Sequence, residues 1–167
     1  RGLVGDVGCQ RGGVAPRRRD LSTRTAPHPM SETRPSKQAL PAPASLRGAG
    51  LAAAARGEPL VVMTTLEGCP YCAIVRGHYL MPMRREGKVH AVQLDVRDRS
   101  SSLQGFDGQL TTPAEQARAW NARFTPTVLF FGPTGRELAE RLVGVAVPDF
   151  YGEYLEARLS EARQKLR

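Results

Sequence analysis

The sequence contains few cysteines and no long hydrophobic run, and these absences exclude several classes of protein. Its 167 residues include three cysteines, too few for the disulfide framework of a small secreted scaffold. No run of about 18 apolar residues occurs, so no membrane-spanning helix is expected. The 17 glycines and 13 prolines follow no three-residue period, which excludes collagen. A chain of this length is expected to form one domain with one core.

Aromatic residues are scarce, and all of them lie in the later part of the chain. The five Phe, the four Tyr and Trp120 come after residue 57. Residues 1–57 hold ten of the 24 basic residues but only three of the 16 acidic ones. A segment with so few core-forming side chains cannot offset its ordering entropy. We therefore predict a disordered basic tail, rich in Gly, Pro, Ala and Arg, over residues 1–57 and a folded domain over residues 58–167.

The net charge of +8 belongs mostly to this tail and by itself suggests nucleic acid or anionic lipid. The tail has no aromatic side chain that could stack on bases. We therefore expect a solvated leader or linker and no specific nucleic-acid binding. The stretch from Leu46 to Ala55 is too short and too rich in Ala and Gly for a secretory signal. Cys9 is expected to have no role.

Hydrophobic patterning after residue 57 predicts an α/β fold. Short apolar runs rich in β-branched residues are typical of strands, and apolar positions three or four residues apart are typical of helices. Strands are expected at 60–64, 89–96, 127–131 and 137–143. Helices are expected at 70–80, 113–122 and from 148 onward, with an inserted loop at 97–108. This order predicts a central mixed sheet of about four strands flanked by helices, with parallel pairing early and an antiparallel hairpin at the end.

Prolines and side-chain spacing predict the ends and faces of the helices. Pro70 suits the first turn of the first helix, whereas Pro82 is expected to disturb or end that helix. Thr112 and Glu115 form a capping box at the start of the second helix. The buried stripe of the last helix is expected at Tyr151, Leu155, Leu159, Ala162 and Leu166.

The chemistry is expected at Cys69-Pro70-Tyr71-Cys72, where the first strand becomes a helix. There Cys69 faces the unpaired N–H groups of the first helical turn, which favour a nucleophilic thiolate. Cys72 lies one turn further and is expected to be more buried, so it would resolve a mixed disulfide formed by Cys69. A redox dithiol needs no metal and no organic cofactor, because its two electrons travel in the cysteine pair.

Three other interpretations of the two cysteines stay open. A zinc site needs four ligands, and the remaining Cys and His residues stand at unsuitable spacings. A purely structural disulfide gains little in so short a loop. The pair could also be two inert buried thiols. The remaining candidates for metal ligands are Cys9, His28, His78 and His90.

The dithiol motif, together with Phe124-Thr125-Pro126-Thr127 before a strand and Val143-Gly144 before the last helix, resembles the thioredoxin superfamily. The resemblance runs from about Glu58 to Leu166. It implies a thioredoxin fold in which Pro126 is a cis proline packed on the active-site disulfide. It also implies that the backbone of Thr125 pairs with an extended substrate segment. Pro70 and Tyr71 are further candidate substrate contacts.

Within the superfamily, the wide gap around Gly105–Gly108 is similar to that of exported, thioredoxin-related bacterial proteins. This resemblance implies a monomeric reductase of protein disulfides in the periplasm, with a protein disulfide or thiol as substrate and a membrane thiol as electron donor. A reducing cytosol would suit the same chemistry. Two departures from thioredoxin stand out: Gly68 replaces a tryptophan, and Met63 replaces a buried acid that assists deprotonation of the second cysteine.

Three further functions are weighed against the reductase. Glutaredoxins share the Pro-Tyr pair, but the lone Gly144 and the sequence before Pro126 disfavour glutathione as partner. A disulfide-forming oxidant is compatible with the same inner dipeptide. A binding or chaperone-like module without redox turnover is favoured by Met63. Glu67 is expected to be a neighbouring surface charge.

Overall fold

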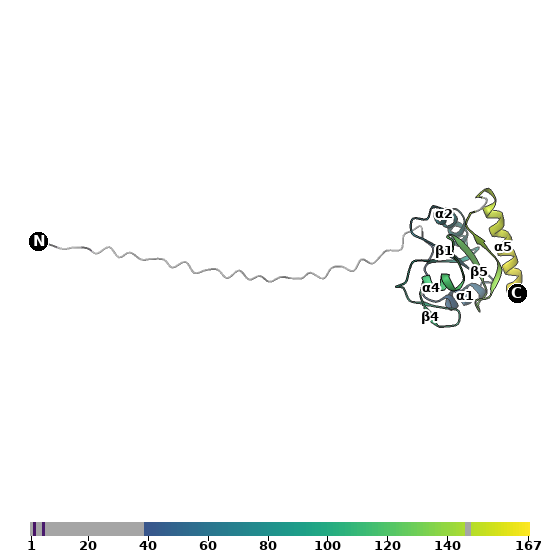
Figure 1. The fold of residues 1–167 in the computed structure, drawn as a ribbon, viewed down its shortest axis with the longest axis horizontal. Coiled ribbons are helices and arrows are strands. Elements are labelled where there is room, and N and C mark those ends of the chain that lie inside the picture. Colours follow the sequence, from purple (N-terminus) through teal and green to yellow (C-terminus); the bar gives the residue numbers. More distant parts are fainter. Residues whose placement is uncertain (1, 3–4, 6–38, 146–147) are drawn as a thin grey trace. The chain divides into compact units, whose positions relative to one another are not determined.

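The computed structural model describes residues 2, 5, 39–145 and 148–167. Its centre is a four-stranded sheet of order β2-β1-β5-β6 (Figure 1). β1 pairs with β2 in parallel and with β5 antiparallel, and β5 pairs antiparallel with β6. The mixed sheet and its final hairpin are therefore confirmed. The four strands are β1 (Leu60–Thr65), β2 (His90–Asp95), β5 (Thr127–Phe131) and β6 (Glu137–Val143).

Helices cover both faces of this sheet, and the alternation of side chains along each strand divides the core between the two faces. On one face, the helical region after β1 and α5 pack on Val61, Met63, Val128 and Phe130. On the other face, α1 packs on a second cluster that includes Leu60. The helices are α1 (Leu46–Ala54), α2 (Pro70–Ile74), the π-helical η1 (Val75–Leu80), α3 (Met81–Arg85), α4 (Pro113–Ala119), the 3-10 turn η2 (Pro148–Phe150) and α5 (Tyr151–Leu166).

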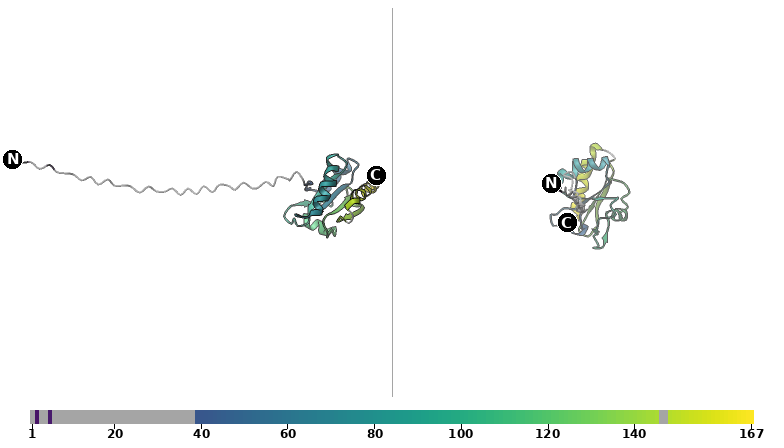
Figure 2. Two further views of the ribbon diagram at one scale, coloured as in Figure 1. Left: turned by 90° about the horizontal axis from the view of Figure 1, so that it is seen from above. Right: turned by 90° about the vertical axis from the view of Figure 1, so that its left-hand side faces the viewer.

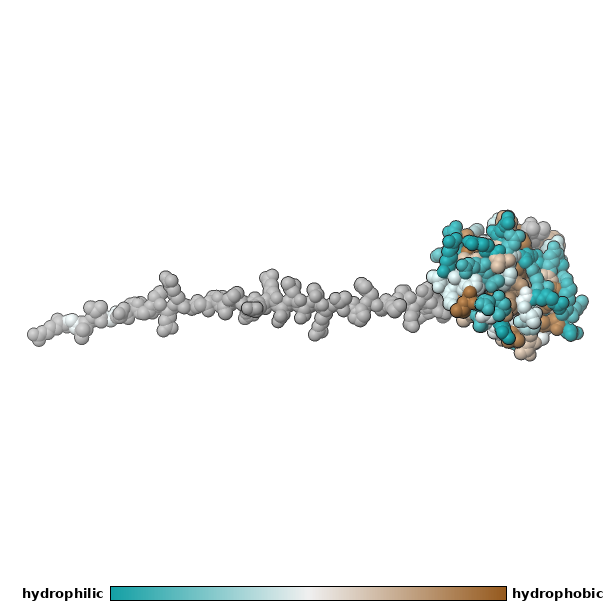
Figure 3. Space-filling view, turned by 60° about the horizontal axis from the view of Figure 1, so that its bottom comes forward, coloured by the Kyte–Doolittle hydropathy of each residue, from teal (hydrophilic) through white to brown (hydrophobic). Residues whose placement is uncertain are grey.

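The last helix follows its predicted stripe at four of five positions, whereas Leu166, in its last turn, is only partly buried. Tyr151, Leu155, Leu159 and Ala162 are buried, and α5 lies against β5 and β6 (Figures 1 and 2). One face of the described domain is covered mainly by hydrophilic residues, with small hydrophobic patches between them (Figure 3). None of the helices in the described ranges is long and apolar enough to cross a membrane.

The prediction that a tail extends to residue 57 is wrong for residues 39–57. Leu46, Gly50 and Ala53 fall on one face of α1 and are buried, and the Ser45 hydroxyl caps the helix by accepting from the Gly48 N–H at 3.0 Å. Composition averaged over 57 residues concealed this short amphipathic stretch. Apart from residues 2 and 5, the predicted tail over residues 1–38 lies outside the described residues.

Pro82 disturbs the predicted helix but does not end it, since the helix continues through α3 to Arg85. The π-helical segment η1 precedes the proline, and the Met81 N–H donates to the carbonyl of Arg76, five residues back. Such a bulge shifts the hydrogen-bond register ahead of a residue that has no N–H to donate. The expected loop at 97–108 contains β3 (Leu103–Gln104), which pairs with β4 (Leu110–Thr111) as a small antiparallel ribbon.

Candidate active site

The two cysteines lie where β1 gives way to α2. Cys69 is the N-cap residue of α2 and its Sγ accepts from the Cys72 N–H at 3.2 Å. Pro70 occupies the first turn, where its missing N–H costs no hydrogen bond. Cys69 and Cys72 are paired as a disulfide, with their Cα atoms 5.3 Å apart. The strand-to-helix turn thus holds both sulfurs at the end of the sheet.

The two sulfurs differ sharply in access to solvent. Cys72 is fully buried, at 0% exposure, in the core between the sheet and α5. Cys69 is half-buried, and its neighbours Pro70 and Tyr71 are exposed. A disulfide in another protein can therefore reach the Cys69 sulfur, whereas Cys72 is accessible mainly to Cys69 itself. This asymmetry agrees with the roles that the sequence predicts for the two residues.

The loop before β5 lies directly against Cys69, although it is 56 residues away in the chain. The carbonyl oxygen of Thr125 lies 3.7 Å, and its hydroxyl 3.8 Å, from the Cys69 Sγ. The Thr125–Pro126 peptide bond is cis, and Pro126 is buried. Its carbonyl accepts from the Gly144 N–H at 2.7 Å. The loop is therefore held from the β6 side while Thr125 faces the dithiol.

A rim of exposed apolar side chains surrounds this loop. Tyr71, Phe124 and Val143 are 54%, 68% and 49% exposed. Val143 pairs with Thr127 across the final hairpin, and Phe124 and Val143 line one hollow of about 610 Å³. Such a rim suits contact with the apolar side chains of a polypeptide. Phe124 and Val143 carry no individual signal in the sequence, since only the fold places them in one hollow.

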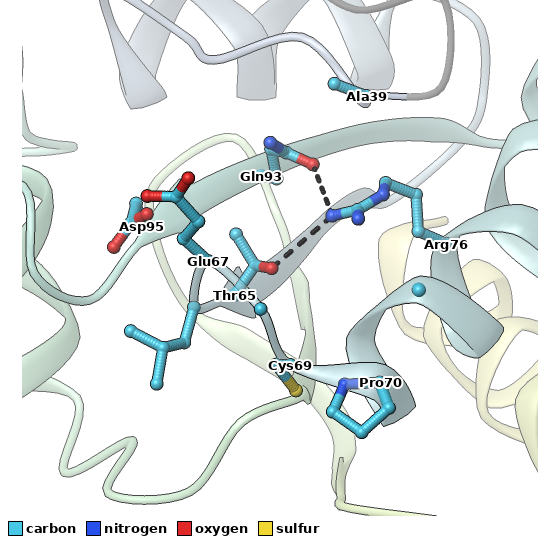
Figure 4. Close-up of a pocket in the computed structure, with 11 residues that line it drawn as sticks. Ala39, Thr65, Glu67, Cys69, Pro70, Arg76, Gln93 and Asp95 are labelled. Atoms are coloured by element: carbon cyan, nitrogen blue, oxygen red, sulfur yellow. Dashed lines mark hydrogen bonds between the residues drawn. The ribbon is translucent and has the colours of Figure 1, made fainter.

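A pocket of about 490 Å³, lined by both charged and apolar residues, lies on the β2 side of Cys69 (Figure 4). Arg76, which follows the dithiol on the same helical region, donates to the hydroxyl of Thr65 and the side-chain carbonyl of Gln93, both at 3.4 Å. Glu67 and Asp95 also line the pocket. No sequence signal identified Arg76, because its partners come from two strands whose register only the fold provides.

Among the residues that the structure describes, none of those in the core around Cys72 is an acid. Met63 is fully buried and belongs to the same cluster as Cys72. Within the described ranges the buried polar residues are Thr64, Thr65 and Thr127. No group of three His, Cys, Asp or Glu residues in these ranges is placed to hold a metal ion. Any proton that leaves Cys72 must therefore pass to water, to Cys69 or to a group outside this core.

Comparisons with known proteins bear on this site. The model of the thioredoxin-like domain family matches residues 49–158, a range that includes the dithiol and the Thr125–Pro126 loop. A search of curated proteins finds no match. Solved structures similar to this chain include thioredoxin O2 from Arabidopsis thaliana in its oxidized state, at 17% identity and a TM-score of 0.48, covering 72% of this chain and 96% of that one.

Two further structures are similar at the same level. Thioredoxin from Fasciola hepatica is 16% identical with a TM-score of 0.49, and the match covers 74% of this chain and 99% of that one. The periplasmic thioredoxin SoxS from Paracoccus pantotrophus is 20% identical with a TM-score of 0.40, and the match covers 63% of this chain and 99% of that one.

Proposed function

This chain belongs to the thioredoxin-like family, and we propose that its Cys69–Cys72 pair reduces disulfide bonds in proteins. The family and the disulfide between these two cysteines support thiol–disulfide oxidoreductase chemistry in general. The observation that carries the proposal is the unequal access to the two sulfurs, with Cys69 half-buried and Cys72 fully buried. This asymmetry supports attack on the substrate by Cys69 and its release by Cys72.

The reaction proceeds in two exchanges. The Cys69 thiolate of the reduced protein attacks one sulfur of the substrate disulfide, forming a mixed disulfide and expelling the other sulfur as a thiolate. Cys72 then loses its proton and attacks the Cys69 sulfur. The second substrate sulfur leaves as a thiolate, and the intramolecular disulfide forms. The substrate gains two electrons and, from solvent, two protons, while the protein dithiol loses the same number of each.

The residues around the dithiol favour the first exchange. The Cys72 N–H at 3.2 Å and the N-cap position stabilise negative charge on the Cys69 sulfur. The backbone of Thr125 lies beside that sulfur, which supports its pairing with an extended substrate segment. The exposed rings of Tyr71 and Phe124 offer apolar contact to a substrate.

The oxidised pair must be reduced again by another dithiol before the next turnover. We assign this step to a membrane thiol donor of the bacterial cell envelope, on the strength of the family resemblance. A reducing cytosol could supply the same two electrons, so the thiol chemistry of the pair is independent of this assignment.

The direction of electron flow is tested by the reduction potential of the Cys69/Cys72 pair, measured by equilibration in defined dithiothreitol or glutathione buffers. We expect a value near that of thioredoxin, about −270 mV. A value near about −120 mV would identify a disulfide-forming oxidant instead. If the pair shows no reversible two-electron couple, the protein is neither a disulfide reductase nor a disulfide-forming oxidant.

A binding module without redox turnover is the second candidate, favoured by the exposed rim of Tyr71, Phe124 and Val143 and by the apolar residue at Met63. The double variant C69S/C72S separates the two. If the protein is a binding module, the double variant still retains its partner in a pull-down from cells. If the protein is a reductase, the double variant no longer reduces a disulfide substrate such as insulin. The single variant Cys72→Ser is expected to accumulate a mixed disulfide with substrate, which non-reducing electrophoresis detects.

A further inference from the structure

A polar hollow lies beside α4, and its charge differs from that of the pocket at Arg76. Its volume is about 340 Å³. Three of the residues that line it are arginines, Arg99, Arg118 and Arg123, and we call the hollow the arginine pocket. We propose that the arginine pocket binds acidic side chains of the substrate protein that flank the disulfide to be reduced. This inference rests on the proposed function and specifies the substrate class.

The pocket is open because its wall is made of small residues. Ala114 and Ala117 from α4, together with Ala122, are 7%, 2% and 9% exposed. Their methyl groups leave room that a larger side chain would fill. The three arginines are exposed, so long cationic side chains surround a shallow apolar base. Because all three arginines line this space, we expect more than one guanidinium group to reach a carboxylate that enters it.

The three positive charges are not neutralised within the described ranges. The ion pairs there use other basic residues, namely Lys88, Arg141, Arg158, Arg163 and Lys165. Arg123 instead donates to the side-chain oxygen of the uncharged Asn121 at 2.7 Å. Guanidinium groups bind carboxylates through paired hydrogen bonds. Three of them in one hollow therefore favour an anionic ligand that the described chain does not itself supply.

The carboxylates closest to the pocket in sequence are engaged elsewhere. Asp98 accepts from the backbone N–H groups of Ser100 and Ser101, both at 2.9 Å, which hold it in its own turn. Glu115 on α4 accepts from the Thr111 hydroxyl at 3.3 Å. It forms no ion pair with Arg118, one helical turn away, among the contacts of the described residues.

Two chain segments that line the arginine pocket lead to the redox site. Arg123 precedes Thr125 by two residues, and it also lines the hollow formed with Phe124 and Val143. In the other segment, the Val96 N–H donates to the carbonyl of Thr65 at 3.0 Å, at the end of the strand that leads to Cys69. An extended chain rises about 3.3 Å per residue. We therefore expect a substrate paired with Thr125 to bring residues a few positions from its cysteine to the arginines.

The test compares two synthetic peptides, each cyclised by one disulfide and differing only in two Glu or two Gln residues placed two and three positions from one cysteine. Pre-reduced protein is mixed with each peptide, and a single turnover is followed by chromatography at low salt and in about 0.5 M NaCl. We expect the Glu peptide to be reduced about five-fold faster at low salt, with the preference falling toward unity at high salt.

The charge-reversal variant R99E/R118E leaves the dithiol and Thr125 untouched and is expected to abolish or invert the preference. The matched control is Arg136→Glu, which should retain the preference. Arg136 immediately precedes β6, at the other end of the sheet from Cys69. If R99E/R118E fails to fold by circular dichroism, R99Q/R118Q replaces it.

Three results would contradict the inference. Equal rates for both peptides in the wild-type protein, with normal turnover, overturn it and leave the proposed reductase intact. A preference that survives in the folded double variant also overturns it, because the selectivity then lies elsewhere. Failure to reduce either peptide or insulin would instead refute the reductase, and this inference with it.

Discussion

Thr64 and Thr127 are joined by two hydrogen bonds through one buried hydroxyl. The Thr64 Oγ1 accepts from the Thr127 N–H at 3.1 Å and donates to the Thr127 carbonyl at 3.4 Å. Both residues are almost fully buried. Thr64 lies near the end of the strand that leads to Cys69, and Thr127 begins the strand that follows Pro126. This hydroxyl therefore fixes the two halves of the redox site to each other.

Replacing Thr64 with Val keeps the shape of the side chain but removes the hydroxyl. The Thr127 N–H is then left buried without this partner, which costs about 1–3 kcal/mol of folding free energy. The Thr125 loop also loses the hydrogen bonds that join Thr127 to the Thr64 hydroxyl, so insulin reduction should slow. Chemical denaturation and a turnover assay measure the two effects. The control Thr64→Ser retains the hydroxyl and should lie much closer to wild type in both; equal behaviour of the two variants would contradict this role.

The helix α1 offers a test of the corrected domain boundary. Leu46 is fully buried in the second core, whereas Leu51 on the same helix is 54% exposed. Truncating a buried leucine to Ala costs about 2–5 kcal/mol, because transfer and cavity terms add. We therefore expect Leu46→Ala to lower the free energy of unfolding by about this amount and Leu51→Ala to change it little. If the two variants unfold at the same denaturant concentration, α1 does not belong to the folded domain.

Local patterns predicted most of the fold. The runs at Thr127–Phe131 and Glu137–Val143 have the bounds of β5 and β6. The first is an apolar run buried on both faces, and the second follows the turn at Gly132–Gly135 as the returning strand of a hairpin. The composition of residues 1–57 did not predict α1. Its three buried residues are a small part of a long stretch rich in Arg and Pro, so they had little effect on the average composition. Patterns of neighbours also could not show that Pro82 would be preceded by a π-helical segment.

The candidate site was predictable only where it is local in sequence. The position of Cys69 at a helix start follows from the residues around it, whereas the approach of Thr125 came from family resemblance. Arg76 with Thr65 and Gln93, and the three arginines beside α4, are brought together by strand register and by the return of the chain to β5. These contacts join residues separated by many positions, and a single sequence carries no local signal for them.

His90 gives the fold a dependence on pH near neutrality. Burial first, and then the positive charges of Arg84 and Arg56, lower the pKa of His90 below its usual value of 6.5. The unfolded chain therefore binds more protons than the folded one just below pH 6.5, so stability is fully present above that pH and is lost as the pH falls. The variant His90→Gln should show a flatter pH dependence of unfolding free energy between pH 5 and 7. His78→Gln, at an exposed position, serves as control and should keep the wild-type slope.

The variant Met63→Asp tests whether an acid near Cys72 would alter stability and the second exchange. The side chain is fully buried in the cluster that contains Cys72, so in Met63→Asp a carboxylate would lose its hydration. Burial raises the pKa of such a carboxyl, and the unfolded chain then binds fewer protons than the folded one between its usual pKa and the raised value. Stability of this variant should accordingly fall as the pH rises through that interval.

The same carboxylate, once ionised, can accept the proton of Cys72 and accelerate the second exchange. Stopped-flow measurement of mixed-disulfide decay above pH 7 should therefore show faster resolution in Met63→Asp than in wild type, even though the variant is less stable. Met63→Leu is the matched control, since it changes packing by little and adds no base. A decay rate in the Asp variant equal to that of the Leu variant would mean that proton transfer from Cys72 does not limit resolution, and that the apolar residue at this position costs the enzyme nothing in rate.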